Sequence, residues 1–125
     1  MTTADQDEIA RLKSRMIMKS YYVMFRRVVD RTKLSTVLLA HYQWIIGLEK
    51  KGLVFASGPL FEADGGPGVG MTVFRVANFE EATALAQGDP FCESGAATFE
   101  IMRWQLNEGR IHVSIDLSDQ TCRLE

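Results

Sequence analysis

The sequence contains few of the residues that build metal centres and disulfide scaffolds. Its 125 residues include two cysteines, Cys92 and Cys122, and two histidines, His41 and His112. The cysteines lack Cys-x-x-Cys spacing and the histidines belong to no His-Glu-x-x-His motif, so the common zinc and redox patterns are missing. We therefore expect two free thiols in a reducing compartment, no metal and no disulfide framework.

Excess positive charge and long apolar runs are also lacking. Fourteen Lys and Arg against sixteen Asp and Glu give a formal net charge of −2, which disfavours general binding to a nucleic-acid backbone. No window approaches the roughly 20 apolar residues of a membrane helix, and the polar N-terminus does not resemble a signal peptide. We expect a cytoplasmic protein with neither a nucleic-acid nor a membrane partner.

What the chain does contain is the composition of one ordinary globular domain. Hydrophobic residues make up 46% and charged residues 24%, a balance that suits a packed core and argues against disorder. A chain of this length can bury a single sizeable core. We expect a flexible N-terminal arm over residues 1–15, a domain over residues 16–109, and a C-terminal strand and tail over residues 110–125.

The expected elements follow the order strand, helix, strand, strand, helix, strand, and then a tail. Strand-forming residues gather in four runs, at residues 16–27, 53–57, 71–77 and 98–106. Helical spacing of apolar residues covers 34–48, and a shorter helix is expected between an N-cap at Asn78 and a stop at Gly88. Apolar and polar residues alternate from Ile111 to Leu117, which predicts one extra half-buried strand.

This order is typical of the ferredoxin-like βαββαβ arrangement, an α+β fold whose antiparallel sheet carries both helices on one face. Large apolar residues are too numerous for two modest helices alone to cover; they include Phe25, Phe74, Phe99 and Trp104. We therefore expect a homodimer in which two sheets pack face to face. The extra C-terminal strand is expected to contribute to that dimer or to a higher homo-oligomer.

His41 is the most informative single residue. It lies on the apolar stripe of the helix expected over 34–48, four residues from both Val37 and Ile45. A titratable ring on that face is either a core histidine satisfied by one hydrogen bond or a base for proton transfer. Asp89 is the carboxylate best placed to orient it, unless Asp89 is only a turn residue before Pro90. The spacing alone leaves both interpretations open.

Two further features are weaker candidates for a site. Ser57-Gly58-Pro59 ends an expected strand, where a hydroxyl and backbone amides could hold a substrate oxyanion or could simply form a turn. The glycine-rich stretch 65–70 lacks the Lys-Ser/Thr of a phosphate loop and joins two strands, so we expect no nucleotide there. Arg26 and Arg27 could attract a carboxylate ligand, although basic residues at a strand end are usually exposed.

Five short motifs together resemble the YciI-like, or YCII-related, family. They are His41–Trp44, Leu48–Gly52, Phe55–Leu60, Glu80–Ala82 and Asp89–Gly95. Each motif is weak alone, but their order and spacing from about Met18 to Trp104 make the combination fairly specific. The resemblance implies a dimeric α+β barrel of ferredoxin-like subunits, with His41 and Asp89 as the active-site pair.

The chain departs from the family pattern at two places. Leu38 occupies a position, three residues before His41, where family sequences often carry Arg. Loss of that cation would alter the preferred substrate charge or the pKa of the histidine. The tail from Asn107 onward also extends beyond the usual family end.

The resemblance also limits the chemistry. The wider group of dimeric α+β barrels includes lactone isomerases, dehydrohalogenases and oxygenases acting on small ring compounds. We expect a cofactor-free isomerase or lyase in which His41, oriented by Asp89, moves a proton on a small cyclic or aromatic substrate. Ser57, Gly58 and Pro59 would bind that substrate and hold an enolate-like oxygen. The alternative, which Leu38 favours, is a non-catalytic small-molecule sensor or assembly module of the same fold.

Overall fold

The computed structural model describes residues 1–65 and 68–124. Contacts within the chain divide it into two compact units. One unit is Ser20–Gln105, and the other combines Met1–Lys19 with Leu106–Glu125. Each unit is described by itself.

The larger unit is built on an antiparallel sheet with the strand order β2-β3-β1-β4. The strands are β1 (Lys19–Val28), β2 (Val54–Pro59), β3 (Gly70–Phe74) and β4 (Ala97–Leu106). In the pairing of β1 with β3, Tyr22 lies opposite Phe74, and in that of β2 with β3, Ser57 lies opposite Thr72. This topology confirms the expected ferredoxin-like α+β fold class. The expectation that 65–70 binds no nucleotide involves residues 66–67, which lie outside the described residues.

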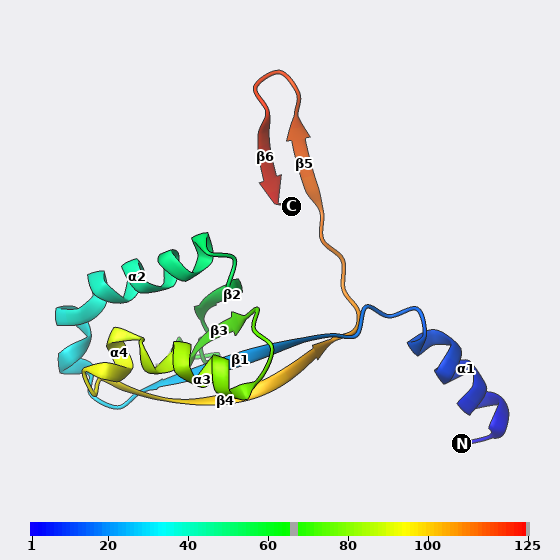
Figure 1. Cartoon of the computed structure of the whole chain (residues 1–125), viewed down its shortest axis with the longest axis horizontal. Coiled ribbons are helices and arrows are strands. Elements are labelled where there is room, and N and C mark those ends of the chain that lie inside the picture. The colour runs from blue at the N-terminus through cyan, green and yellow to red at the C-terminus, as the bar shows by residue number, and fades with distance from the viewer. Residues whose placement is uncertain (66–67, 125) are drawn as a thin grey trace. The chain divides into compact units, whose positions relative to one another are not determined.

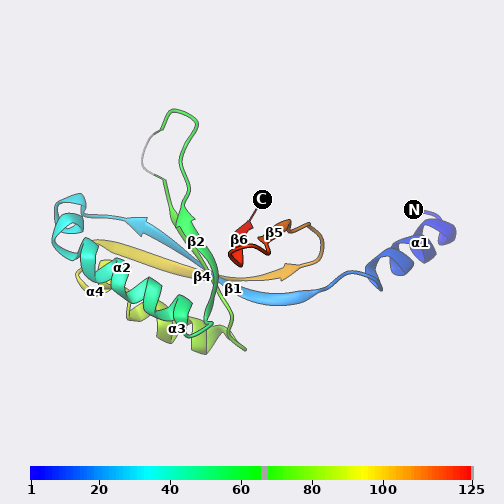
Figure 2. The ribbon, with the colours of Figure 1, turned by 90° about the horizontal axis from the view of Figure 1, so that it is seen from above.

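Helices α2 (Leu34–Lys50), α3 (Phe79–Gln87) and α4 (Pro90–Glu93) pack on one face of the sheet, as Figures 1 and 2 show. A short 3-10 turn, η1 (Arg31–Lys33), leads into α2. α3 begins where the side chain of Asn78 accepts a hydrogen bond from the amide of Glu81, at 2.8 Å. Of the described helices, none is long and apolar enough to cross a membrane.

The helix α4 was not predicted from the sequence. Asp89 and Pro90 do end α3, as expected, but they also start a new helical turn. The side chain of Asp89 accepts a hydrogen bond from the amide of Phe91, and Pro90 occupies the first helical position, where its missing N–H costs nothing. Asp89 is therefore held rigidly between two helices rather than placed in a loop.

The core lies between the helices and the sheet. Its buried residues are Tyr22, Met24, Leu48, Phe74, Ala82 and Ala86. Phe74 belongs to this cluster and Phe99 packs against it. The helices therefore cover two of the four large residues that were expected to be covered by a second copy of the chain. Phe25 follows Met24 and points to the opposite face, because side chains alternate along a strand. Tyr21 also lies on that face, where its ring contacts Phe55 and Trp104 at 5.1 and 5.9 Å between centroids.

Three strand predictions in the larger unit need correction. The third strand covers Gly70–Phe74 and ends three residues before the predicted end at Ala77. The first strand begins at Lys19 rather than Met16, because Met18 has a positive φ of 47° that interrupts extended backbone. The second strand continues through Gly58 and Pro59 instead of turning there. Because β2 is an edge strand, the missing N–H of Pro59 does not break a ladder.

The smaller unit contains α1 (Thr3–Lys13) and a hairpin of β5 (Val113–Asp116) and β6 (Thr121–Leu124). Thr2 and Asp5 form reciprocal capping hydrogen bonds at the start of α1. The prediction of one extra C-terminal strand was incomplete, since β5 pairs antiparallel with β6, with Val113 opposite Leu124. β6 was not predicted, because Thr121–Leu124 is too short to show a clear alternation of apolar and polar residues.

Candidate active site

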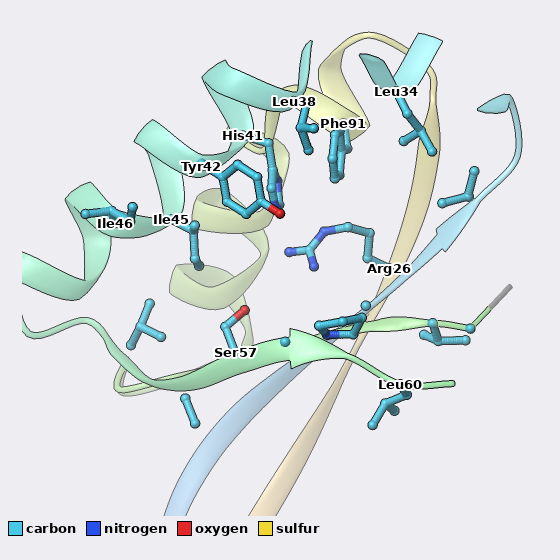
Figure 3. A pocket seen from close by; sticks show the side chains of 18 of the residues that line it. Arg26, Leu34, Leu38, His41, Tyr42, Ile45, Ile46, Ser57, Leu60 and Phe91 are labelled. Atoms are coloured by element: carbon cyan, nitrogen blue, oxygen red, sulfur yellow. The ribbon is translucent and has the colours of Figure 1, made fainter. Parts of the chain in front are cut away.

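A cavity of about 730 Å³ opens in the larger unit between α2 and the sheet. Figure 3 shows side chains of α2 on one side of this space and those of β1 and β2 facing them. Most of the lining is apolar, including Leu34, Leu38, Ile45, Val69 and Phe91. A volume of this size suits a small organic ligand. His41, Arg26 and Ser57 bring polar groups to the cavity.

The structure brings His41 and Asp89 together across a separation of 48 residues. His41 lies on the inner stripe of α2, and its Nδ1 is 2.8 Å from Oδ1 of Asp89. The His41 ring also stacks on Phe91, with centroids 3.9 Å apart and planes 7° from parallel. The hydrogen bond and the stacking together restrict the orientation of the imidazole.

Asp89 is fully buried and remains a carboxylate. Burial by itself would raise the pKa of Asp89. The hydrogen bond from His41, the positive charge of Arg26 and the amide of Phe91 act against it, and the net result is a pKa below the usual value of 3.8. An ionised carboxylate has no proton to donate, so Nδ1 of His41 must carry the shared proton. Nε2 is then the nitrogen left for other chemistry.

Arg26, a weak candidate for binding a carboxylate ligand by its sequence, belongs to the site through contacts that the sequence did not predict. Expected to be exposed, it is 5% exposed, and its Nε donates a hydrogen bond of 2.5 Å to Oδ2 of Asp89. Its Nη2 donates to Oγ1 of Thr72 at 3.0 Å and lies 3.3 Å from Sδ of Met24. One signal was present in the sequence, because Tyr22, Met24 and Arg26 fall on the same face of β1. Arg27 is exposed, as expected.

Two nitrogen atoms at this site have no hydrogen-bond partner among the described residues. They are Nε2 of His41 and Nη1 of Arg26. The other side-chain nitrogens of these two residues all contact a partner. Among the described side chains that are not exposed, every fully buried nitrogen or oxygen has a partner. Both unpaired atoms must therefore be accessible to solvent, and both residues line the cavity.

Comparison with known proteins places this arrangement in a family. The model of the YCII-related domain matches residues 20–105. The chain belongs to the YCII-related family. His41, Asp89 and Arg26 all lie within the YCII-related domain, whereas α1, β5 and β6 lie outside it.

A solved structure has the same fold as the YCII-related domain. It is 5-chloro-2-hydroxyhydroquinone dehydrochlorinase from Burkholderia phenoliruptrix AC1100, in complex with 2,5-dihydroxybenzoquinone. The TM-score is 0.51 at 18% sequence identity, and the similarity covers 67% of this chain and 93% of that chain. At this identity the similarity shows the fold alone. No curated protein matches the chain.

The motif Ser57-Gly58-Pro59 lines the cavity of the YCII-related domain from β2. Oγ of Ser57 lies 3.1 Å from the carbonyl oxygen of Met71 and 2.8 Å from Oγ1 of Thr72. Thr72 also accepts a hydrogen bond from Arg26, so a chain of hydrogen bonds connects Ser57 to the guanidinium. Pro59 has no amide hydrogen, which restricts backbone donation at this motif to Ser57 and Gly58. Their role in substrate binding stays a prediction.

The cysteines do not add a nucleophile to the site. Cys92 and Cys122 are both free, as expected. Burial and the nearby charge of Asp89 raise the pKa of Cys92 to about 11, against the opposing effect of Arg26. Cys92 is therefore a protonated thiol at neutral pH and a poor nucleophile. Among residues 1–65 and 68–124, no three His, Cys, Asp or Glu side chains are grouped to hold a metal ion.

Proposed function

We propose that this YCII-related protein is a cofactor-free enzyme in which His41 acts as a general base on a small organic molecule. The observation that supports this function is the 2.8 Å contact between Nδ1 of His41 and Asp89, which leaves Nε2 unpaired among the described residues on a side chain that lines the cavity. A base needs one nitrogen fixed and the other free, and this geometry provides both. The two free thiols suit the reducing cytoplasm, where we propose that the protein works.

The proposed reaction begins with removal of a proton from a carbon next to a carbonyl group. Nε2 of His41 takes the proton, and the electron pair of the C–H bond moves to the carbonyl oxygen to form an enolate. The carboxylate of Asp89 stabilises the resulting imidazolium. In an isomerase the proton returns to a different carbon, whereas in a lyase a leaving group departs with its electron pair from the neighbouring carbon.

The cavity favours a small cyclic or aromatic substrate. Its volume of about 730 Å³ and its apolar walls, such as Leu34 and Ile45, can cover a ring. The structurally similar dehydrochlorinase acts, by its name, on a chlorinated hydroxyhydroquinone. That analogy supports ring compounds as a substrate class here, with Ser57, Gly58 and Pro59 as binding residues.

A second candidate is a non-catalytic small-molecule sensor or assembly module. Leu38 favours it, because this side chain lines the cavity and is 42% exposed at a position where the family often carries Arg. Such a module would bind the same ring compounds without turning them over. The two functions therefore differ in turnover and not in binding.

The test is a turnover screen with lactones and halogenated hydroquinones, followed by single substitutions. We expect His41→Ala to lower the rate by about 10²–10⁴-fold, the usual contribution of a general base. Asp89→Asn should lower it less, since the amide keeps the shape but loses the charge. His112→Ala is the matched control, because His112 is exposed and lies outside the larger unit. Turnover by His41→Ala close to that of the wild type would instead favour the sensor.

A further inference from the structure

We propose that Arg26 is the anion-binding residue of the cavity, so that the ligand bears a negatively charged oxygen, a carboxylate or a phenolate, on Nη1 of Arg26. The inference deepens the proposed function by naming the charge of the ligand. It rests on that function only for placing the reacting carbon beside His41. The proposal concerns the equilibrium binding of an organic anion and not its conversion to product.

The first argument is the distribution of the guanidinium N–H groups. Arginine has five N–H donors: one on Nε and two on each Nη. Nε donates to Asp89, and Nη2 contacts Thr72 and Met24. Nη1 keeps two N–H groups without a partner among the described residues, although Arg26 as a whole is 5% exposed. A cationic donor is thus presented at the cavity wall with both of its hydrogens unused.

The second argument is that Arg26 does not form the contact expected of a purely structural ion pair. Such pairs often use two parallel N–H···O bonds to the two carboxylate oxygens. Here Oδ1 of Asp89 is occupied by His41 and the amide of Phe91, so Arg26 reaches only Oδ2. Thr72 then holds Nη2 in place. These contacts fix the plane of the guanidinium and leave Nη1 free to donate. A donor held in position in this way is preorganised to bind an anion.

The third argument is the sign of the charge that the cavity presents. Asp89 is fully buried, so its negative oxygens are covered by His41, Phe91 and Arg26, while Nη1 remains accessible. Figure 3 shows the guanidinium of Arg26 projecting into the space between α2 and β2. The other charged residues in the lining are Arg31 and Glu49, which are exposed and opposite in sign. The inner part of the cavity therefore presents a cationic N–H donor at its wall, while the carboxylate oxygens of Asp89 are covered.

Gly70 leaves the space beside Nη1 open. A Cβ atom at this position would lie 2.7 Å from Nη1, closer than real Cβ contacts allow. Gly70 also lines the cavity. Any side chain here would either displace the guanidinium from its hydrogen bonds or cover the unused donor.

The test compares benzoate with benzamide, two ring compounds of almost the same shape that differ in charge. Binding of each to the full-length protein is measured by calorimetry at low salt. We expect benzoate to bind at least about tenfold more tightly, because hydrogen bonds to charged groups are stronger than neutral ones. Equal affinity for the two compounds, or no binding of benzoate, would overturn the proposal.

Substitutions then test whether Arg26 is the residue that causes the preference for benzoate over benzamide. Arg26→Gln should reduce the preference for benzoate to near unity while benzamide still binds. Arg31→Gln is the matched control, because Arg31 is an exposed arginine in the same lining. It should retain most of the preference. If the two substitutions reduce the preference equally, a diffuse surface charge selects the anion and the proposal is wrong.

A measurement on the wild-type protein covers the case in which Arg26→Gln does not fold. Benzoate should shift the guanidinium ¹⁵N resonances of Arg26 in a saturable titration, and benzamide should not. Unmoved Arg26 resonances at saturating benzoate would overturn the proposal. None of these measurements uses turnover, so Arg26 can fail as an anion site while His41 passes its kinetic test, and the reverse.

Discussion

At the scale of single residues, Asp89 connects the parts of the site. Its buried carboxylate accepts hydrogen bonds from His41 on α2, from Arg26 on β1 and from the amide of Phe91 on α4. Replacing any one partner changes the environment of the other two. Effects of substitutions at His41, Arg26 and Asp89 should therefore not be additive.

The lowered pKa of Asp89 predicts an acid-dependent loss of stability. A carboxyl group whose pKa is depressed by folding stabilises the folded state above its unfolded value near 3.8, and this contribution is lost as the pH falls through the lower, folded value. Asp89→Asn should reduce the free energy of unfolding at pH 7 by about 3 kcal/mol or more, because it leaves buried Arg26 without its counter-charge.

Urea unfolding between pH 7 and pH 2 checks this prediction. Between pH 5 and 2, stability should decline less steeply in Asp89→Asn than in the wild type. Asp7→Asn, at an exposed carboxylate of α1, is the control and should follow the wild-type profile. Parallel acid profiles for Asp89→Asn and the wild type would contradict the assignment.

At the scale of elements, the junction of α3 and α4 determines where Asp89 lies. α3 is fastened at its start by Asn78, and its buried side, Ala82 and Ala86, packs directly on the core. Small residues allow the helix to approach the sheet closely. The end of α3 then places Asp89 next to the sheet. The site thus depends on a helix that contributes no residue to the cavity lining.

Removing the N-cap of α3 should destabilise the protein without altering the cavity. Asn78→Ala leaves the amide of Glu81 without its acceptor and should cost about 0.5–2 kcal/mol of unfolding free energy. Asn78→Asp keeps an acceptor at the same position and is the matched control. Thermal or urea denaturation measures both. A loss for Asn78→Asp as large as that for Asn78→Ala would show that the cap is not the cause.

At the scale of the whole molecule, the sheet face opposite the helices predicts a homodimer. Met102 is 57% and Trp104 38% exposed, although both are large apolar residues on a strand. Sheet-to-sheet packing of two copies should bury more than ~1,500 Å² in total. Sedimentation at micromolar concentration should therefore show a dimer.

A substitution on this face checks how the dimer forms. Trp104→Glu should shift the equilibrium toward monomer, because it places a charge within the predicted interface. Leu39→Glu, at a 70% exposed position on α2, should not. A wild-type monomer at micromolar concentration would refute the predicted assembly.

The hairpin β5–β6 carries its own prediction. Its apolar residues are highly exposed, among them Ile111, Val113, Ile115, Leu117 and Leu124. Truncation after Gly109 should change the oligomeric state or lower the melting temperature, since these side chains need a cover. Sedimentation and calorimetry on the truncated chain measure both. Identical behaviour of the two chains would mean that the hairpin takes no part in assembly. The expected division into an arm, a domain and a tail likewise stays a prediction.

The sequence by itself determined the order of the six main elements, β1, α2, β2, β3, α3 and β4, and the fold class. Apolar residues three and four apart marked α2, strand-forming runs marked β1 to β4, and the Asn78 and Gly88 signals marked α3. These patterns are local, so they can be read without knowing what packs against them. The pairing of His41 with Asp89 was one of two open interpretations of the residues, and the family resemblance favoured it; the spacing alone could not decide, because 48 residues separate them.

Tertiary structure alone decided the chemistry around that pair. Alternation along β1 places Arg26 on the same face as Tyr22 and Met24, but it does not say which carboxylate lies above that face. Asp89, 63 residues away, meets Arg26 only when α3 packs on the sheet and α4 begins. Once both charges are buried, each needs a partner, and these contacts leave Nε2 of His41 and Nη1 of Arg26 without a partner among the described residues. Which polar atoms remain free depends on all their neighbours together, and that information exists only in the folded chain.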